Sequence, residues 1–162
     1  MTNEQEFVRL VMQHERLFYK VSSFYAKTTE ERKDLYQEIV LQLWKAYPSF
    51  RNDAKISTWI YRIALNTAVT LIRKEKRAVS LASMDIYKVQ LPDNIDSELD
   101  DRIQQLYKQI EHLNQLEKAL VLLYLEEKSY AEISEITGIS ESNVGTRLSR
   151  IKQKLREQMF NQ

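Results

Sequence analysis

Long stretches of the sequence repeat apolar residues at the spacing of an α-helix, and little in the chain would interrupt them. Apolar residues recur three and four positions apart through residues 4–26, 30–47 and 57–76, and again after residue 102. Only two Gly and two Pro occur among the 162 residues, whereas a β-rich chain would need many turns rich in both. The sequence therefore predicts an all-α protein.

The helical spacing is lost between residues 79 and 101, and this loss divides the chain. The segment contains Pro92 and, between residues 85 and 101, six acidic residues against Lys88 alone. We predict two small helical domains, residues 1–78 and 102–162, joined by a flexible acidic linker at residues 79–101.

Several classes of function lack the residues that they need. The absence of Cys excludes disulfides and thiolate zinc sites, and neither His14 nor His112 has a second ligand at metal-binding spacing. There is no Gly-rich phosphate loop, nucleophile elbow or convincing catalytic pair. We therefore expect no catalytic residue, metal, cofactor or small-molecule substrate. No apolar run suits a signal peptide or a membrane span, so we expect a cytoplasmic protein.

Charge is sorted along the chain, although the net charge is only +1. Residues 51–77 contain seven basic residues against two acidic ones, and residues 144–156 contain five basic residues and no acidic one. Two basic blocks on either side of an acidic segment indicate a nucleic-acid partner that the net charge alone would hide.

The second predicted domain contains the local signals of a helix-turn-helix. Ser129 and Glu132 have the spacing of a capping box that opens a short helix. Gly138 suits the left-handed residue that ends this helix, and Ser140 can cap the next one. Because two helices joined by a short turn containing Gly make a helix-turn-helix, we predict this motif near the end of the chain.

Short polar and basic side chains gather on the outer side of the second helix of this motif. They are Ser142, Asn143, Thr146, Arg147, Arg150 and Lys154. Short polar side chains near the start of such a helix can reach base edges in the major groove, while Arg and Lys can hold phosphates. The alternative is a C-terminal amphipathic helix with a solvated basic face, but the turn and the caps together favour DNA binding.

A Trp lies among polar and basic residues in the predicted helix at residues 57–76. At about 100° per residue, Ile60 and Ala64 share the apolar face, whereas Trp59, Arg62 and Asn66 gather on nearly the opposite side. Aromatic faces, amides and cations together suit single-stranded nucleic acid, because they can stack on bases, bond to base edges and hold phosphates. The alternative is that Trp59 only covers the edge of a core.

The predicted helix at residues 30–47 also has a polar side, which carries Asp34, Gln37, Glu38 and Leu41. Such a face is usually just solvated. An exposed Leu41 beside Trp44 leaves room for a protein-binding patch.

Two long stretches resemble the extracytoplasmic-function (ECF) group of bacterial sigma factors, of the sigma-70 family. "DLYQEIVLQLWKAYPSF" followed by "RNDAKISTWIYRIALNTA" is similar to region 2 of that family, and "LYLEEKSYAEISEITGISESNVGTRLSRIKQKLRE" is similar to region 4. The resemblance covers nearly the whole chain outside the predicted linker, with both regions in the family's order.

The resemblance implies a non-enzymatic transcription initiation factor that binds core RNA polymerase, recognises the −35 and −10 promoter elements and assists promoter melting. It also implies an anti-sigma factor as a partner. Region 2 would capture a flipped base of the −10 strand in the loop at residues 50–57. The residues implied at the −10 element are Phe50, Arg51, Asn52, Asp53, Lys55, Trp59, Arg62, Asn66 and Arg73. The α-helical face of Asp34, Gln37, Glu38 and Leu41 would bind core polymerase, and the outer face of the last helix would bind the −35 duplex.

One position departs from the family's pattern. Family members often carry Lys or Arg where this chain has Gly145, which weakens the helix by roughly 1 kcal/mol relative to Ala and removes one potential contact. Gly145 could permit a close approach of the backbone to DNA, and the −35 sequence stays open. Two other classes of protein also stay open, namely a dimeric helix-turn-helix regulator that acts alone and a helical adaptor that binds only protein.

Overall fold

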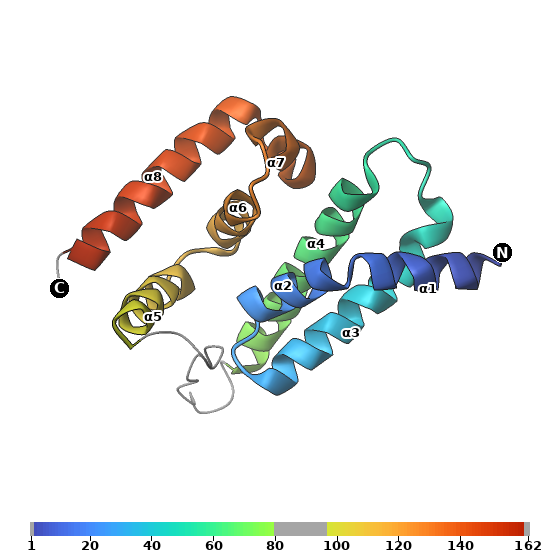
Figure 1. Cartoon of the computed structure of the whole chain (residues 1–162), viewed down its shortest axis with the longest axis horizontal. Helices are drawn as coiled ribbons and strands as arrows, with labels where there is room; N and C mark the ends of the chain where they lie inside the picture. The colour runs from blue at the N-terminus through green and yellow to red at the C-terminus, as the bar shows by residue number, and fades with distance from the viewer. Residues whose placement is uncertain (1, 80–96, 161–162) are drawn as a thin grey trace. The chain divides into compact units, whose positions relative to one another are not determined.

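All the secondary structure that the computed structural model describes, over residues 2–79 and 97–160, is helical, which confirms the all-α prediction. The first part holds α1 (Asn3–Gln13), α2 (Glu15–Tyr25), α3 (Thr29–Ala46), the short 3-10 helix η1 (Tyr47–Ser49) and α4 (Ile56–Val79) (Figure 1). The second part holds α5 (Ser97–Glu111), α6 (Gln115–Leu125), α7 (Tyr130–Thr137) and α8 (Glu141–Phe160). No helix within these described ranges is both long and apolar enough to cross a membrane.

The chain divides into two compact units, residues 1–88 and 89–162, and each is described by itself. Most of the predicted linker, residues 80–96, lies outside the described residues. Its last residues, 97–101, belong to α5 instead. The acidic residues that suggested a solvated linker also suit the first turns of a helix, because the helix dipole favours negative charge there. The predicted domain limits therefore stay a prediction. The first helix of the second unit begins at Ser97, before the predicted limit of residue 102.

The core of the first unit lies where α2, α3 and α4 pack against one another. α3 buries Leu35, Ile39 and Leu43, as their helical spacing predicts, and α4 buries Ile60 and Ala64. Removing apolar side chains from water stabilises this packing by roughly 25 cal/mol per Å². Each helix thus buries one face, and the opposite face carries exposed polar side chains such as Asp34 of α3 and Asn66 of α4.

The apolar stripe at residues 4–26 is divided between two helices rather than lying on one. His14 separates α1 from α2, with φ of −114° and ψ of 18°. Its backbone N–H is shared between the carbonyl oxygens of Leu10 and Val11, both at 3.2 Å. The ring nitrogen Nδ1 also lies 3.0 Å from the Leu10 oxygen. These contacts satisfy the end of α1 and let the chain turn before α2.

α1 is anchored to the rest of the first unit by Phe7, its one buried residue. The Phe7 ring centroid lies 5.0 Å from that of Trp44 at the end of α3 and 5.5 Å from that of Tyr47 in η1. Aromatic pairs at such distances stabilise by about 0.5–1.5 kcal/mol beyond their buried area. This packing places α1 beside the segment that joins α3 to α4.

The second unit is built around α8, which packs against α5, α6 and α7. α8 turns Val144, Leu148 and Ile151 into the core, where all three are almost completely buried. Leu120 of α6 and Ile133 of α7 are fully buried beside them. The apolar stripe predicted for the last helix is thus confirmed at these three positions, and its outer side stays open to solvent.

Candidate nucleic-acid and protein interfaces

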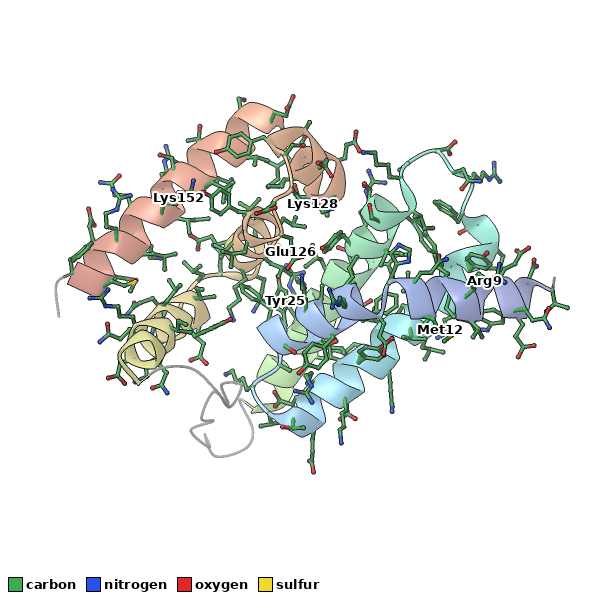
Figure 2. The ribbon with its side chains drawn as sticks, in the orientation of Figure 1. Arg9, Met12, Tyr25, Glu126, Lys128 and Lys152 are labelled. Carbon is green, nitrogen blue, oxygen red and sulfur yellow. The ribbon has the colours of Figure 1, made fainter. Side chains whose placement is uncertain are left out.

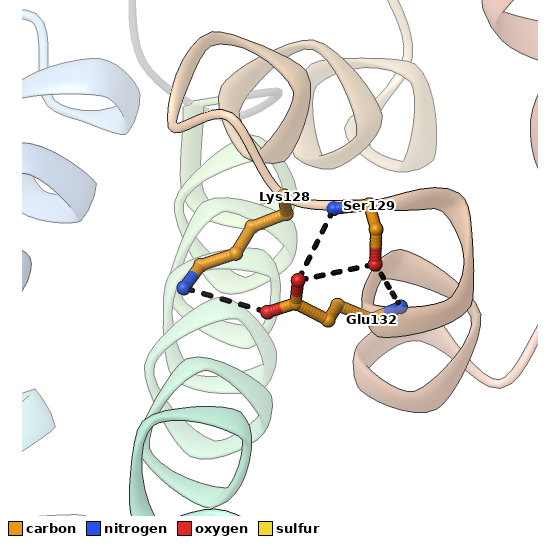
Figure 3. Close-up of polar contacts among 3 residues, drawn as sticks. All are labelled: Lys128, Ser129 and Glu132. Atoms are coloured by element: carbon orange, nitrogen blue, oxygen red, sulfur yellow. Dashed lines mark hydrogen bonds and ion pairs between the residues drawn. The ribbon is translucent and has the colours of Figure 1, made fainter.

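The start of α7 is fixed by the predicted capping box. Ser129 Oγ accepts a hydrogen bond from the Glu132 backbone N–H at 3.1 Å, and Glu132 Oε1 accepts one from the Ser129 backbone N–H at 3.4 Å (Figure 3). Lys128 Nζ lies 3.8 Å from the other oxygen of the same carboxylate. Two otherwise unpaired N–H groups of the helix start are satisfied in this way.

The turn between α7 and α8 has the predicted geometry as well. Gly138 adopts φ of +81°, a left-handed conformation that strains other residues, and its N–H donates to the Ser134 carbonyl at 2.8 Å. Ser140 Oγ then accepts from the Asn143 backbone N–H at 3.2 Å and caps α8. The predicted helix-turn-helix is therefore confirmed in its local structure.

The outer side of α8 presents the predicted −35 residues together. Ser142, Asn143, Thr146, Arg150 and Lys154 are exposed, and Arg147 is half-buried. Arg147 Nε donates to Asn143 Oδ1 at 3.1 Å, one helical turn away. This bond holds the guanidinium against the helix, so that Asn143 and Arg147 form one donor-rich unit rather than two independent side chains.

Gly145 has a neighbour that the sequence did not reveal. A Cβ atom at this position would lie 3.3 Å from Cε2 of Tyr130, the first residue of α7. The Tyr130 side chain is nevertheless 43% exposed. The space beside Gly145 is thus taken by an aromatic ring of the protein, at the edge of the α8 outer face, and Tyr130 is a contact candidate that helical spacing alone could not find.

The basic side chains of residues 144–156 do not all point into solvent. Lys152 Nζ lies 3.9 Å from the centre of the Tyr124 ring, on the side of α8 that faces α6 (Figure 2). A cation over an aromatic face is held by about 0.5–2 kcal/mol. Lys152 therefore stabilises the packing of α8 on α6, and Arg150 and Lys154 are the exposed cations nearest to it in sequence.

In the first unit, the segment between η1 and α4 exposes most of its predicted −10 residues. Arg51, Asn52, Asp53 and Lys55 are all exposed. Asn52 adopts φ of +59°, a left-handed conformation that Asn tolerates better than most residues. On the outer side of α4, Arg62, Asn66 and Arg73 are exposed too.

Trp59 does not point freely outward, so this part of the prediction needs correction. Its side chain is half-buried, and its ring centroid lies 4.7 Å from that of Phe50 and 6.5 Å from that of Tyr47. Both partner rings come from outside α4, which is why the helical projection missed them. Trp59 therefore covers part of an aromatic cluster, and a role in DNA binding would use the part of the ring that remains open.

The outer face of α3 combines carboxylates with exposed apolar groups. Asp34 and Gln37 are exposed, and Glu38 is half-buried with its Oε1 accepting from Gln42 Nε2 at 2.9 Å. Leu41 is 44% exposed and Trp44 is 43% exposed. Exposed large apolar side chains beside charged ones are typical of a protein-binding surface.

Among the side chains that the structure describes, no group of three or more His, Cys, Asp or Glu is placed to hold a metal ion.

Comparison with known proteins identifies the family. The model of sigma-70 region 2 matches residues 10–78, and the model of sigma-70 region 4 matches residues 103–155. RNA polymerase sigma factor SigV of Bacillus subtilis strain 168 is 27% identical, over 98% of this chain and 93% of that protein. ECF RNA polymerase sigma factor SigW of the same strain is 28% identical, over 97% and 90%. The chain belongs to the ECF group of the sigma-70 family.

Two solved structures have folds similar to that of this ECF sigma factor. The sigma factor RpoE, determined in complex with the anti-sigma factor NepR from Bartonella quintana, has a TM-score of 0.79 at 20% identity, covering 96% of this chain and 97% of that one. CnrH, in complex with the cytosolic domain of CnrY, has a TM-score of 0.68 at 19% identity, covering 95% and 87%.

Membership in the family confirms the predicted class of function. The ECF sigma factor is a transcription initiation factor and not an enzyme. Its regions 2 and 4 correspond to the parts of a sigma factor that bind core RNA polymerase and promoter DNA. The roles of individual residues stay predictions.

Proposed function

We propose that this ECF sigma factor works in the bacterial cytoplasm, where its first domain binds core RNA polymerase and the unpaired −10 strand and its second domain binds the −35 duplex. The proposal rests on two surfaces, each within a stretch that a sigma-70 family model matches. The surface on α4 is aromatic and polar, and the surface on α8 is polar and basic. An unpaired strand needs stacking faces, whereas a duplex groove needs a protruding helix.

At the −35 element, α8 lies in the major groove. Ser142, Asn143 and Thr146 stand near its start, where recognition helices contact base edges. Arg150 and Lys154, farther along the same side, hold phosphates. Because the other face of α8 is packed in the core, the helix presents these groups in one fixed orientation.

At the −10 element, the segment at residues 50–57 and the outer side of α4 hold bases after they leave the duplex. Flipping a base costs a few kcal/mol. Stacking on an aromatic side chain returns about 1–3 kcal/mol per base. Phe50 and Trp59 supply the rings, Asn66 an amide for a base edge, and Arg62 and Arg73 positive charge. Capturing the strand is how a protein without an ATPase motif helps to melt a promoter.

The outer face of α3, with Asp34, Gln37, Glu38 and Leu41, binds core polymerase. We propose that an anti-sigma factor controls access to this face. Two similar folds were solved in complex with an anti-sigma factor or with the cytosolic domain of a partner. The exposed Leu41 and Trp44 give such a partner an apolar area to cover.

The test is to mix the purified chain with bacterial core RNA polymerase and to transcribe a library of genomic fragments. Polymerase binding, followed by initiation at a small set of sites that share −35 and −10 sequences, is the expected result. Tight binding of duplex DNA by the chain alone, without polymerase binding, would contradict the proposal and favour a helix-turn-helix regulator that acts alone.

A further inference from the structure

Asn143 and Arg147 lie one helical turn apart near the start of α8, the part of a recognition helix that meets base edges. Arg147 Nε donates to Asn143 Oδ1 at 3.1 Å. Because an Arg side chain has only donors, the amide atom that faces it must be the oxygen. Among the residues that the structure describes, no carboxylate pairs with the Arg147 guanidinium. The charge and the two terminal nitrogen atoms of Arg147 are therefore available to a ligand.

The hydrogen bond determines what this Asn143–Arg147 pair can still offer. Asn143 Oδ1 is turned towards Arg147, which leaves the N–H groups of Nδ2 for other partners. Arg147 Nε is used as well, which leaves the fork of N–H groups on Nη1 and Nη2. The backbone N–H of Asn143 is already bound to the capping Ser140. The pair consequently presents a set of hydrogen-bond donors, with its one acceptor directed inward.

We infer that the Asn143–Arg147 pair selects guanine in the −35 element, with Arg147 in contact with the base and Asn143 as a positioning residue. Guanine presents two neighbouring acceptors, N7 and O6, in the major groove, whereas adenine and cytosine each present an amino donor there. Thymine presents one acceptor beside a methyl group. A fork of donors therefore matches guanine better than any other base. This assignment rests on the proposed function, which places α8 in the −35 groove and names no base.

The same hydrogen bond argues against adenine, the base that an exposed Asn would suggest. An Asn side chain recognises adenine through both of its amide atoms, which bind N6 and N7. Since Asn143 Oδ1 faces the Arg147 guanidinium, that mode would first have to break an existing bond. Thr146 supplies no competing donor, because its hydroxyl already donates to the Ser142 carbonyl oxygen at 3.0 Å. The pair is thus the main set of donors in this part of α8.

Asn143 contributes by holding the guanidinium in place. A long Arg side chain loses conformational freedom when it binds DNA, and this loss lowers affinity. The bond to Asn143 Oδ1 and the half-burial of Arg147 restrict that side chain before DNA arrives. An acceptor at position 143 should therefore sharpen the base preference of Arg147 without touching the base itself.

The experiment uses the full chain, assembled with core RNA polymerase, and a library of duplex promoters whose −35 element is randomised. Duplexes bound by the wild type and by each variant are sequenced. Arg147→Lys keeps the positive charge but loses the fork, so the preference for guanine at one position should fall by about fivefold or more, as expected when one bidentate base contact is lost. Asn143→Ala should weaken the same preference. Asn143→Asp keeps an oxygen for Arg147 Nε and should retain the preference, although its negative charge weakens binding of every sequence.

Base analogues at the selected position test the contact itself. In 7-deazaguanine the N7 acceptor is missing, whereas inosine keeps N7 and O6 and lacks only the amino group in the minor groove. The wild type should bind the 7-deazaguanine duplex more weakly and the inosine duplex as it binds guanine. Arg147→Ala should bind guanine and 7-deazaguanine equally, because the side chain that distinguishes them is gone.

Unchanged base preferences in Arg147→Lys and Asn143→Ala would overturn the inference, and so would a preference for adenine that Asn143→Ala removes. An equal loss on every sequence from Arg147→Ala would overturn it as well, because Arg147 would then hold a phosphate.

Arg150→Ala, measured in parallel, separates a failure of the pair from a failure of the proposed function. It removes a proposed phosphate contact from the same side of α8, so it should weaken binding of all sequences and leave the guanine preference as in the wild type. If Arg150→Ala does so and the variants of the pair change no preference, only the pair is wrong. If no variant affects duplex binding, the −35 role of α8 is wrong too.

Discussion

The outer faces of α4 and α8 both carry polar and basic residues, but they are held in different ways. α8 starts at a capped turn, buries Val144 and Leu148 on its inner side, and presents Arg150 outward. The α4 face depends on residues from other elements, because Trp59 packs against Phe50 of the preceding segment.

This difference between the α4 and α8 faces suits the two forms of promoter DNA, the unpaired strand and the duplex. A duplex has a regular groove, so one rigid helix can present all its contacts, and its outer residues can change without loss of core packing. An unpaired strand has no regular shape, so its site combines a loop, a helix and aromatic rings. Trp59 consequently serves the packing and, as we propose, the DNA at the same time, whereas the α8 contacts are separate from the core.

The largest effect is expected at Trp59. Because Trp59→Ala removes a half-buried ring and its contact with Phe50, it should lower the free energy of unfolding by about 2 kcal/mol. Asn66→Ala, at an exposed position, should change the unfolding free energy by less than about 0.5 kcal/mol. Denaturant unfolding measures both values, and equal stabilities would show that the aromatic cluster contributes nothing.

Both substitutions should spare core polymerase binding and impair promoter opening, because both remove part of the proposed surface for the unpaired strand. Permanganate footprinting of the holoenzyme on promoter DNA measures the opening directly. Wild-type melting with both variants would show that Trp59 has a purely structural role. It would also show that the α4 face does not bind the unpaired strand.

On α8, Arg150→Ala removes a proposed phosphate contact, so it should weaken binding of a −35 duplex and lower the slope of log affinity against log salt by about 1. Arg147→Ala should also weaken this binding and lower the slope. Lys152→Ala is the matched control, since this lysine lies over Tyr124. A salt titration that gives the same slope and affinity for all the variants would rule out these assignments.

A smaller effect is expected where the helix-turn-helix is capped. Ser129→Ala removes the acceptor for the Glu132 backbone N–H and should destabilise the second unit by about 1 kcal/mol. Ser23→Ala, on an exposed position of α2, is the control and should be nearly neutral. Denaturant unfolding should therefore separate the two Ser variants, and equal midpoints would mean that the cap is not used.

The smallest effect should come from Gly145→Ala. The substitution gains up to about 1 kcal/mol of helix propensity, but the new Cβ requires the Tyr130 ring to move by a few tenths of an ångström. Because Tyr130 is partly exposed, its ring can yield, and we expect a small net stabilisation that grows when Tyr130→Ala is also present. A double-mutant cycle measures this coupling, and a clear destabilisation by Gly145→Ala would show that Tyr130 cannot move.

Much of the second unit was predictable because its signals are local. Ser129, Gly138 and Ser140 each fix the backbone within a few residues of themselves, so the helix-turn-helix could be drawn from sequence spacing. The outer residues of α8 followed from the period of its buried stripe.

The first unit was less predictable because its decisive contacts join distant parts of the chain. A helical projection of α4 uses only the spacing of residues within α4. It therefore could not show that Phe50 and Tyr47 pack against Trp59. The division at His14 was hidden because the apolar stripe continues across it. The orientation of α1 was hidden as well, because it is set by the contact of Phe7 with Trp44 of α3.

The most direct test of the central claim, that α4 acts on unpaired DNA and α8 on the duplex, compares two promoter fragments bound to the holoenzyme. One fragment is the −35 duplex, and the other is a fork whose −10 strand is unpaired. We expect Arg150→Ala to weaken binding of the duplex fragment alone and Asn66→Ala to weaken binding of the fork alone. Equal losses on both fragments from either variant, or no loss on the fork from Asn66→Ala, would contradict the division of labour between the two helices.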